Sequence, residues 1–241
     1  GELYLYFLDT QNATSQELIT QWWNYGALRT YSPGDALLFR PLLWVIIGLE
    51  KLLFGIQSLY WNITSLFAHI LATLSMFALL WTIKKGIVAF LLASLFALNF
   101  MLINAVLYQE IVAYMAFVAL ALLGIRYAWI STRTRSVGAL IVAITAISIA
   151  SFMYEMGLVV ALVMGVYYYL YARSHKLVGV IGFSIVLVIY MVGYVANKGG
   201  ITMPQGGGGG AQVLIVVLSV WVQQFLFPAL YILNATSNLE Y

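Results

Sequence analysis

The chain has 241 residues, of which 63% are hydrophobic and 8% are charged, with a formal net charge of +3. A soluble domain averages roughly 45–50% apolar and about 25% charged residues, so this composition excludes an ordinary soluble fold. The absence of cysteine excludes disulfides, thiolate catalysis and Cys-based metal sites. A small basic excess in such a chain indicates membrane topology, and we expect no nucleic-acid partner.

The first region, residues 1–59, is predicted to be a non-cytoplasmic loop. Its polar start carries several aromatic residues, which suits a segment on the membrane surface. Residues 37–58 are apolar but are interrupted by Arg40, Glu50 and Lys51. We therefore expect this stretch to form an interfacial helix or one that enters the bilayer partway.

Residues 60–241 carry apolar runs that are each near the length a helix needs to cross a bilayer. These runs predict an all-α, polytopic transmembrane bundle of about seven spans, at 60–83, 87–103, 111–130, 137–153, 156–172, 177–196 and 213–233. A glycine-rich outer loop, 197–212, contains the run Gly206–Gly210. This loop is a flexible spacer or a mobile lid over a substrate groove.

The charged residues orient this bundle. If the 60–83 helix runs inward, most of the 11 basic residues reach the cytoplasmic side, namely Lys84, Lys85, Arg126, Arg133, Arg135, Arg173 and Lys176. All of the 8 acidic residues except Glu240 then lie outside. Because acidic residues contribute little to topology, this bias favours a carboxylate-lined site that faces the outer compartment.

Arg40 lies near the outer interface in the segment FRPLLW. Its planar guanidinium group suits a lipid-linked phosphate, since the two can form paired hydrogen bonds. The alternatives are that Arg40 extends to lipid headgroups or pairs with Glu50.

Two glutamates, Glu110 and Glu155, open helices on the outer side, and Tyr154 precedes the second. Partial desolvation beside an aromatic ring would favour proton transfer, and we expect both carboxylates to share one cavity with Arg40. Each acid could instead interact with the positive end of its helix.

Three further residues are candidates. Glu2 and Asp9 lie where a preceding helix would emerge, so either carboxylate is placed to act as a general base on an acceptor hydroxyl. His69 lies inside the 60–83 helix, as a packing hydrogen-bond partner or as a substrate ligand.

Several short motifs follow one another in a recognisable order. They are Arg40-Pro41-Leu42, Leu53-Phe54-Gly55, His69, Phe96-Ala97-Leu98-Asn99-Phe100, Asn104-Ala105-Val106-Leu107-Tyr108, Phe152-Met153-Tyr154-Glu155 and Phe225-Leu226-Phe227-Pro228-Ala229-Leu230. Over residues 30–233 the chain resembles the polytopic GT-C glycosyltransferases, in particular the O-mannosyltransferase-like group that includes the TMTC-type proteins. It departs from the family pattern at Asn99, Phe100 and Asn104, which stand in place of His, Pro and Glu.

This resemblance implies transfer of a sugar from a polyprenyl-phosphate carrier to a protein or glycan hydroxyl on the outer leaflet. It places the catalytic acid at Glu2 or Asp9 or upstream, and Glu110, six residues after Asn104, would compensate for the family glutamate that Asn104 replaces. In the inverting displacement that we expect, Arg40, with Arg29 or Lys198 as a helper, would neutralise the departing phosphate. Asn104 can hydrogen-bond a sugar but cannot act as a base. A divalent metal is compatible with this chemistry but is not required.

A non-enzymatic membrane protein is the alternative, either a transporter or flippase of lipid-linked glycans or an inactive scaffold. A transporter should show broken helices, mid-bilayer charges and an internal repeat, whereas the charges here concentrate at predicted helix ends. In either case we expect a multi-pass protein of a bacterial inner membrane or the endoplasmic reticulum. Since the chain starts with Gly, we expect a fragment or a processed product.

Overall fold

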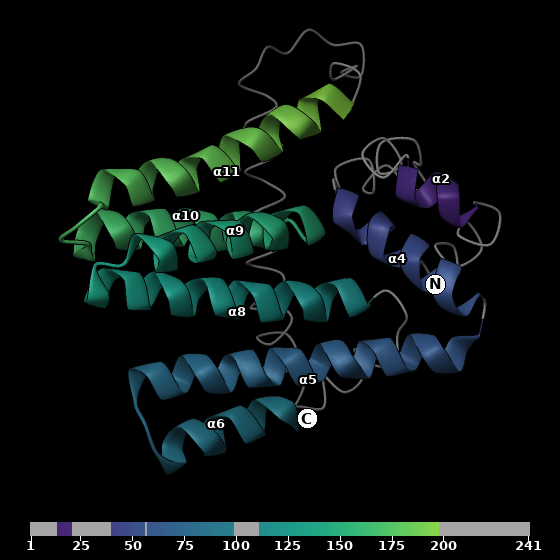
Figure 1. Ribbon diagram of the computed structural model, residues 1–241, viewed down its shortest axis with the longest axis horizontal. Coiled ribbons are helices and arrows are strands. Elements are labelled where there is room, and N and C mark those ends of the chain that lie inside the picture. Colours follow the sequence, from purple (N-terminus) through teal and green to yellow (C-terminus); the bar gives the residue numbers. More distant parts are fainter. Residues whose placement is uncertain (1–13, 21–39, 56, 99–110, 198–241) are drawn as a thin grey trace, which may run out of the picture. The chain divides into compact units, whose positions relative to one another are not determined.

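A computed structural model describes residues 14–20, 40–55, 57–98 and 111–197 of the chain. Within these residues the regular structure is entirely α-helical (Figure 1). The helices are α2 (Ser15–Thr20), α4 (Pro41–Phe54), α5 (Ser58–Ile83), α6 (Ile87–Ala97), α8 (Ile111–Thr134), α9 (Val137–Met153), α10 (Met156–Tyr171) and α11 (Lys176–Asn197). All of them belong to one unit of the chain, Gly1–Lys198.

Three described helices are long and apolar enough to cross a membrane, at Leu59–Ile83, Val112–Thr134 and Lys176–Tyr194. Three shorter apolar helices, α6, α9 and α10, accompany them. The predicted all-α class and the apolar character of the bundle are therefore confirmed for the described residues. The predicted seventh span, 213–233, and the glycine-rich loop 197–212 lie outside them, apart from the last helical residue Asn197.

Side-chain contacts show that α5, α8 and α10 run in the same direction. Arg126 of α8 donates from Nε to the hydroxyl of Thr82 near the end of α5, at 3.0 Å. Thr132 near the end of α8 lies 3.0 Å from the hydroxyl of Tyr167 on α10. The turns that follow these three helices consequently lie at one end of the unit (Figure 1). Exposed basic residues gather there, namely Lys84, Lys85, Arg133, Arg135, Arg173 and Lys176.

Small residues let the helices approach closely, as is common between transmembrane helices. A Cβ atom on Gly179 of α11 would lie 2.1 Å from Cδ1 of Tyr168, so this ring packs directly on the α11 backbone. A Cβ on Gly124 of α8 would lie 2.5 Å from Cγ1 of Ile147 on α9. The main core cluster joins α8, α9, α10 and α11 around these contacts.

The N-terminal helices α2 and α4 pack on each other and on the start of α5 and α8. Thr14 and Glu17 form a capping box at α2, because the Glu17 backbone donates to the Thr14 hydroxyl at 3.1 Å and the Glu17 carboxylate accepts from the Thr14 backbone at 2.7 Å. Pro41 begins α4, where its missing N–H has no helical partner to lose. Buried α4 side chains pack against Leu18 of α2 and Trp61 of α5.

Candidate functional site

The guanidinium group of Arg40 is held by the carboxylate of Glu155 in a two-point ion pair. Nε donates to Oε2 at 2.7 Å and Nη2 donates to Oε1 at 2.6 Å. The two side chains are 20% and 13% exposed, so the pair is shielded but can be reached from outside. Of the expectations for Arg40, pairing with Glu50 is wrong, because the fork-shaped geometry is completed by Glu155.

Tyr154 forms the floor beneath this pair. The Arg40 guanidinium carbon lies 4.2 Å from the centre of the Tyr154 ring, a cation–π distance. The rings of Tyr114 and Phe117 on α8 pack on Tyr154 with centroids 5.4 and 5.5 Å away. Burial raises the pKa of the Tyr154 hydroxyl, and the charge of Arg40 works in the opposite direction. We call Arg40, Tyr154 and Glu155 the arginine cluster.

A tight turn between α9 and α10 positions two members of this cluster. Tyr154 is extended and ends α9, with its N–H donating to the carbonyl of Ala150. Glu155 occupies the N-cap position of α10, yet its side chain makes no capping hydrogen bond. Both carboxylate oxygens instead accept hydrogen bonds from Arg40. Glu155 therefore does not cap α10 with its side chain.

His69 makes its contacts with α6 and not with the arginine cluster. Its Nε2 lies 3.0 Å from the carbonyl oxygen of Ala97, and its ring stacks on Phe96. Ala97 ends α6, so its carbonyl lacks a partner within that helix. The structure thus shows His69 in the helix-packing role, and its second role as a substrate ligand stays a prediction.

Glu50 of α4 is a second buried acid, and it is not among the candidate site residues predicted from the sequence. It is 6% exposed and accepts a hydrogen bond from the hydroxyl of Thr64 on α5. Its other oxygen, Oε2, is buried and has no hydrogen-bond partner within the described residues. Burial raises its pKa to about 7, and the Thr64 hydrogen bond opposes this rise. The sequence signal is an acid, followed by Lys51, inside an otherwise apolar stretch.

The remaining predicted site residues, Glu2, Asp9, Asn104, Glu110 and Lys198, lie outside the described residues. The predicted convergence of Glu110 with Arg40 and Glu155 therefore stays a prediction, whereas Arg40 and Glu155 do meet. Among the described residues, no three His, Asp or Glu side chains come together as a metal site. The described geometry is that of an arginine oriented by a carboxylate and an aromatic ring.

In the described residues, the protein is helical, three of its helices are long and apolar enough to span a membrane, and the arginine cluster is partly buried. Comparisons with the sequence models of known protein families, with curated proteins and with solved structures find no match for the chain. The resemblance to GT-C glycosyltransferases rests on the order of the motifs in this sequence.

Proposed function

We propose that the protein is a multi-pass membrane glycosyltransferase of GT-C type that takes its sugar from a polyprenyl-phosphate carrier. In this proposal the bundle has about seven spans, and the acceptor is a hydroxyl of a protein or glycan on the non-cytoplasmic side. The observation that carries it is the fixed orientation of Arg40, whose guanidinium charge Glu155 and Tyr154 hold at the start of α10, since a guanidinium group suits the oxygens of a phosphate.

The proposed reaction is an inverting displacement. An outer carboxylate, Asp9 or Glu2, or Glu110 in their place, accepts the proton of the acceptor hydroxyl. The hydroxyl oxygen then forms a bond to the anomeric carbon as the bond from that carbon to the phosphate oxygen breaks. The lipid phosphate departs as an anion, and Arg40 stabilises the charge that develops on it.

Glu155 and Tyr154 support this role by fixing the guanidinium group before substrate arrives. A side chain that is already held in one orientation loses less conformational entropy on binding, so a phosphate gains more from it. The position of the cluster also supports the proposal. Tyr154 and Glu155 precede α10, while the exposed basic turns follow α5, α8 and α10 at the other helix ends.

An exchange of charges tests this proposal against a purely structural ion pair. The variants are Arg40→Ala, Arg40→Lys and the double variant Arg40→Glu with Glu155→Arg, and the assay is mannose transfer from polyprenyl-phosphate mannose by the purified protein in liposomes. Arg40→Ala should lower transfer roughly 10- to 150-fold, as the loss of a charged hydrogen bond implies, and Arg40→Lys should lower it less. Arg126→Ala, which removes an arginine bonded to Thr82, is the matched control.

The double variant separates the two roles of Arg40. It should recover thermal stability, because an ion pair forms again, but it should not recover transfer, because the arginine has moved. Recovery of both would overturn the phosphate-binding role. The alternative, a non-enzymatic membrane protein, is favoured by the fact that Glu155 already completes the guanidinium fork and so ties α4 to the α9–α10 turn. Wild-type protein that is folded but transfers no sugar would support that alternative.

A further inference from the structure

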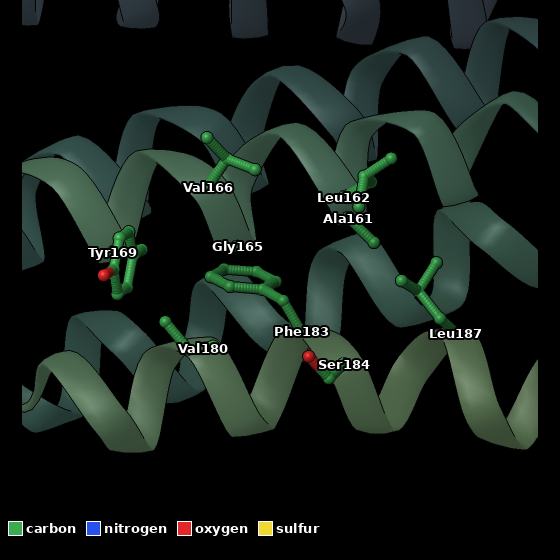
Figure 2. A pocket seen from close by; sticks show the side chains of 9 residues that line it. All are labelled: Ala161, Leu162, Gly165, Val166, Tyr169, Val180, Phe183, Ser184 and Leu187. Carbon is green, nitrogen blue, oxygen red and sulfur yellow. The ribbon is translucent and has the colours of Figure 1, made fainter.

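An apolar groove lies between α10 and α11, away from the arginine cluster. Its volume is about 280 Å³, and its lining side chains come from both helices, with Tyr169 and Val180 at one end and Leu162 and Leu187 at the other (Figure 2). The ring of Phe183 forms the floor, opposite the bare backbone of Gly165. A Cβ atom on Gly165 would meet Phe183 Cβ at an ordinary 3.7 Å, so the missing side chain leaves the groove open.

The rim of this groove faces outward from the helix pair. Leu162, Val166 and Tyr169 are 49%, 51% and 60% exposed, and they lie on a helix that is otherwise apolar. Apolar rims of this kind are covered by hydrocarbon chains when a helix lies in a bilayer. The volume is slightly below the roughly 300–1,000 Å³ of pockets that hold whole small molecules. It therefore suits part of a hydrocarbon chain.

A cationic side chain marks the Tyr169 end of the groove. The ammonium of Lys176, the first residue of α11, lies 4.4 Å from the centre of the Tyr169 ring. Arg173 is exposed in the turn just before it. An apolar groove that ends under cationic groups complements a molecule with a hydrocarbon tail and an anionic head.

We propose that this groove binds one anionic phospholipid, with its phosphate at Lys176 and an acyl chain along Phe183 and Gly165. The proposal is independent of the glycosyltransferase assignment, because it uses no residue of the arginine cluster. The basic turns place the headgroup at the end where Lys176 and Arg173 lie, whereas Arg40 bonds to the start of α10. The lipid therefore serves as a bound structural partner, distinct from a sugar donor.

Native mass spectrometry of the detergent-solubilised protein tests this site. The protein is titrated with phosphatidylglycerol or with phosphatidylcholine of the same chains. Wild-type protein should bind phosphatidylglycerol more tightly than phosphatidylcholine. Lys176→Gln should weaken that binding about fivefold, the effect expected for one basic residue near an anionic headgroup. Gly165→Leu, which fills the groove, should weaken binding of both lipids at least about tenfold.

Matched variants keep the test decisive. Lys84→Gln removes an exposed basic residue from the turn after α5, and Gly138→Leu adds the same bulk where only Ser136 Oγ approaches, at 3.8 Å. Both should bind as wild type does. Ser184→Leu fills the groove from α11 should Gly165→Leu fail to fold.

Three results would overturn the proposal. The first is normal phosphatidylglycerol binding by folded Gly165→Leu or Ser184→Leu protein. The second is an effect of Lys176→Gln no larger than that of Lys84→Gln. The third is tighter, Gly165-dependent binding of a polyprenyl phosphate, which would assign the groove to a sugar carrier.

Discussion

Gly157 near the start of α10 lies directly against the backbone of Ser151 near the end of α9, so that a Cβ atom on the glycine would be 2.5 Å from both N and Cα of the serine. Backbone atoms cannot rotate away as a side chain can. Gly157→Ala should therefore displace the turn that carries Tyr154 and Glu155, and lower the free energy of unfolding by about 1–3 kcal/mol. Unfolding in mixed micelles with increasing dodecyl sulfate measures this.

Gly138 provides the control for that substitution. It occupies the corresponding early position of α9, but open space surrounds it. Gly138→Ala should leave stability unchanged or raise it by up to about 1 kcal/mol, through helix propensity. Equal effects of the two alanines would contradict the close contact at Gly157.

The Arg40–Glu155 pair should show a strong energetic coupling. Both side chains are less than a third exposed, and their two hydrogen bonds are 2.7 and 2.6 Å long. A double-mutant cycle with Arg40→Ala, Glu155→Ala and the combined variant should give a coupling energy of about 1.5–3 kcal/mol. A coupling near zero in the thermal or micellar unfolding data would show that the pair does not tie α4 to the α9–α10 turn.

The pH dependence of stability should report Glu50. Its pKa is raised from 4.5 to about 7 in the folded protein, so between these values the folded state binds more protons than the unfolded state. The contribution of Glu50 to stability should be fully present below pH 4.5, fall by up to about 3 kcal/mol as the pH rises from 4.5 to 7, and then level off. Unfolding midpoints measured across this range test the slope.

Glu50→Gln isolates this contribution. The amide keeps a hydrogen-bonding group beside Thr64 and removes the titration, so the variant should lack this part of the slope and exceed the wild type in stability above pH 7. An unchanged slope in Glu50→Gln would assign the pH dependence to other groups.

His69 should be needed to hold the end of α6. His69→Leu leaves the Ala97 carbonyl without the partner it has at 3.0 Å, and should cost about 0.5–2 kcal/mol of stability. His69→Gln offers an amide donor and should recover part of this loss. Faster hydrogen exchange confined to the end of α6 in His69→Leu would locate the effect, and a uniform change across the bundle would refute it.

The proposed orientation can be tested by cysteine labelling, for which the chain is suited because it contains no cysteine. Single cysteines at Lys84, Arg135 and Arg173 should react from the cytoplasmic side, and those at 104–110 and 197–212 from the other. Labelling of the 197–212 loop from the cytoplasmic side would reverse the proposed orientation.

Helix positions could be predicted well from the sequence. A long apolar run in a bilayer has to satisfy its backbone hydrogen bonds within itself, and a helix does so. The run at 60–83 corresponds to α5 and that at 156–172 to α10, within a residue or two. The predicted run ends at residue 130, before the polar residues Ser131, Thr132 and Arg133, but α8 continues to Thr134. In this last part of the helix, the Arg133 guanidinium carbon lies 4.8 Å from the centre of the Trp129 ring.

The pairing inside the candidate site could not be predicted in the same way. Apolar periodicity places Arg40 and Glu155 near helix starts, yet it carries no information on which helix faces which. Their contact depends on the packing of α4 against α9 and on the tight turn allowed by Gly157. The two possible roles of His69 could not be separated from the sequence for the same reason. Its partner is the backbone carbonyl of Ala97, and any residue at that position would supply this group.

The separation of Arg40 and Glu155 along the chain affects how the protein is made. The two partners are 115 residues apart. At a synthesis rate of about 5–20 residues per second, Glu155 leaves the ribosome roughly 6–23 s after Arg40. During that interval the guanidinium group does not yet have Glu155 as its partner. Completion of the ion pair is consequently a late event of biogenesis, which marks the arrival of the α9–α10 hairpin beside α4.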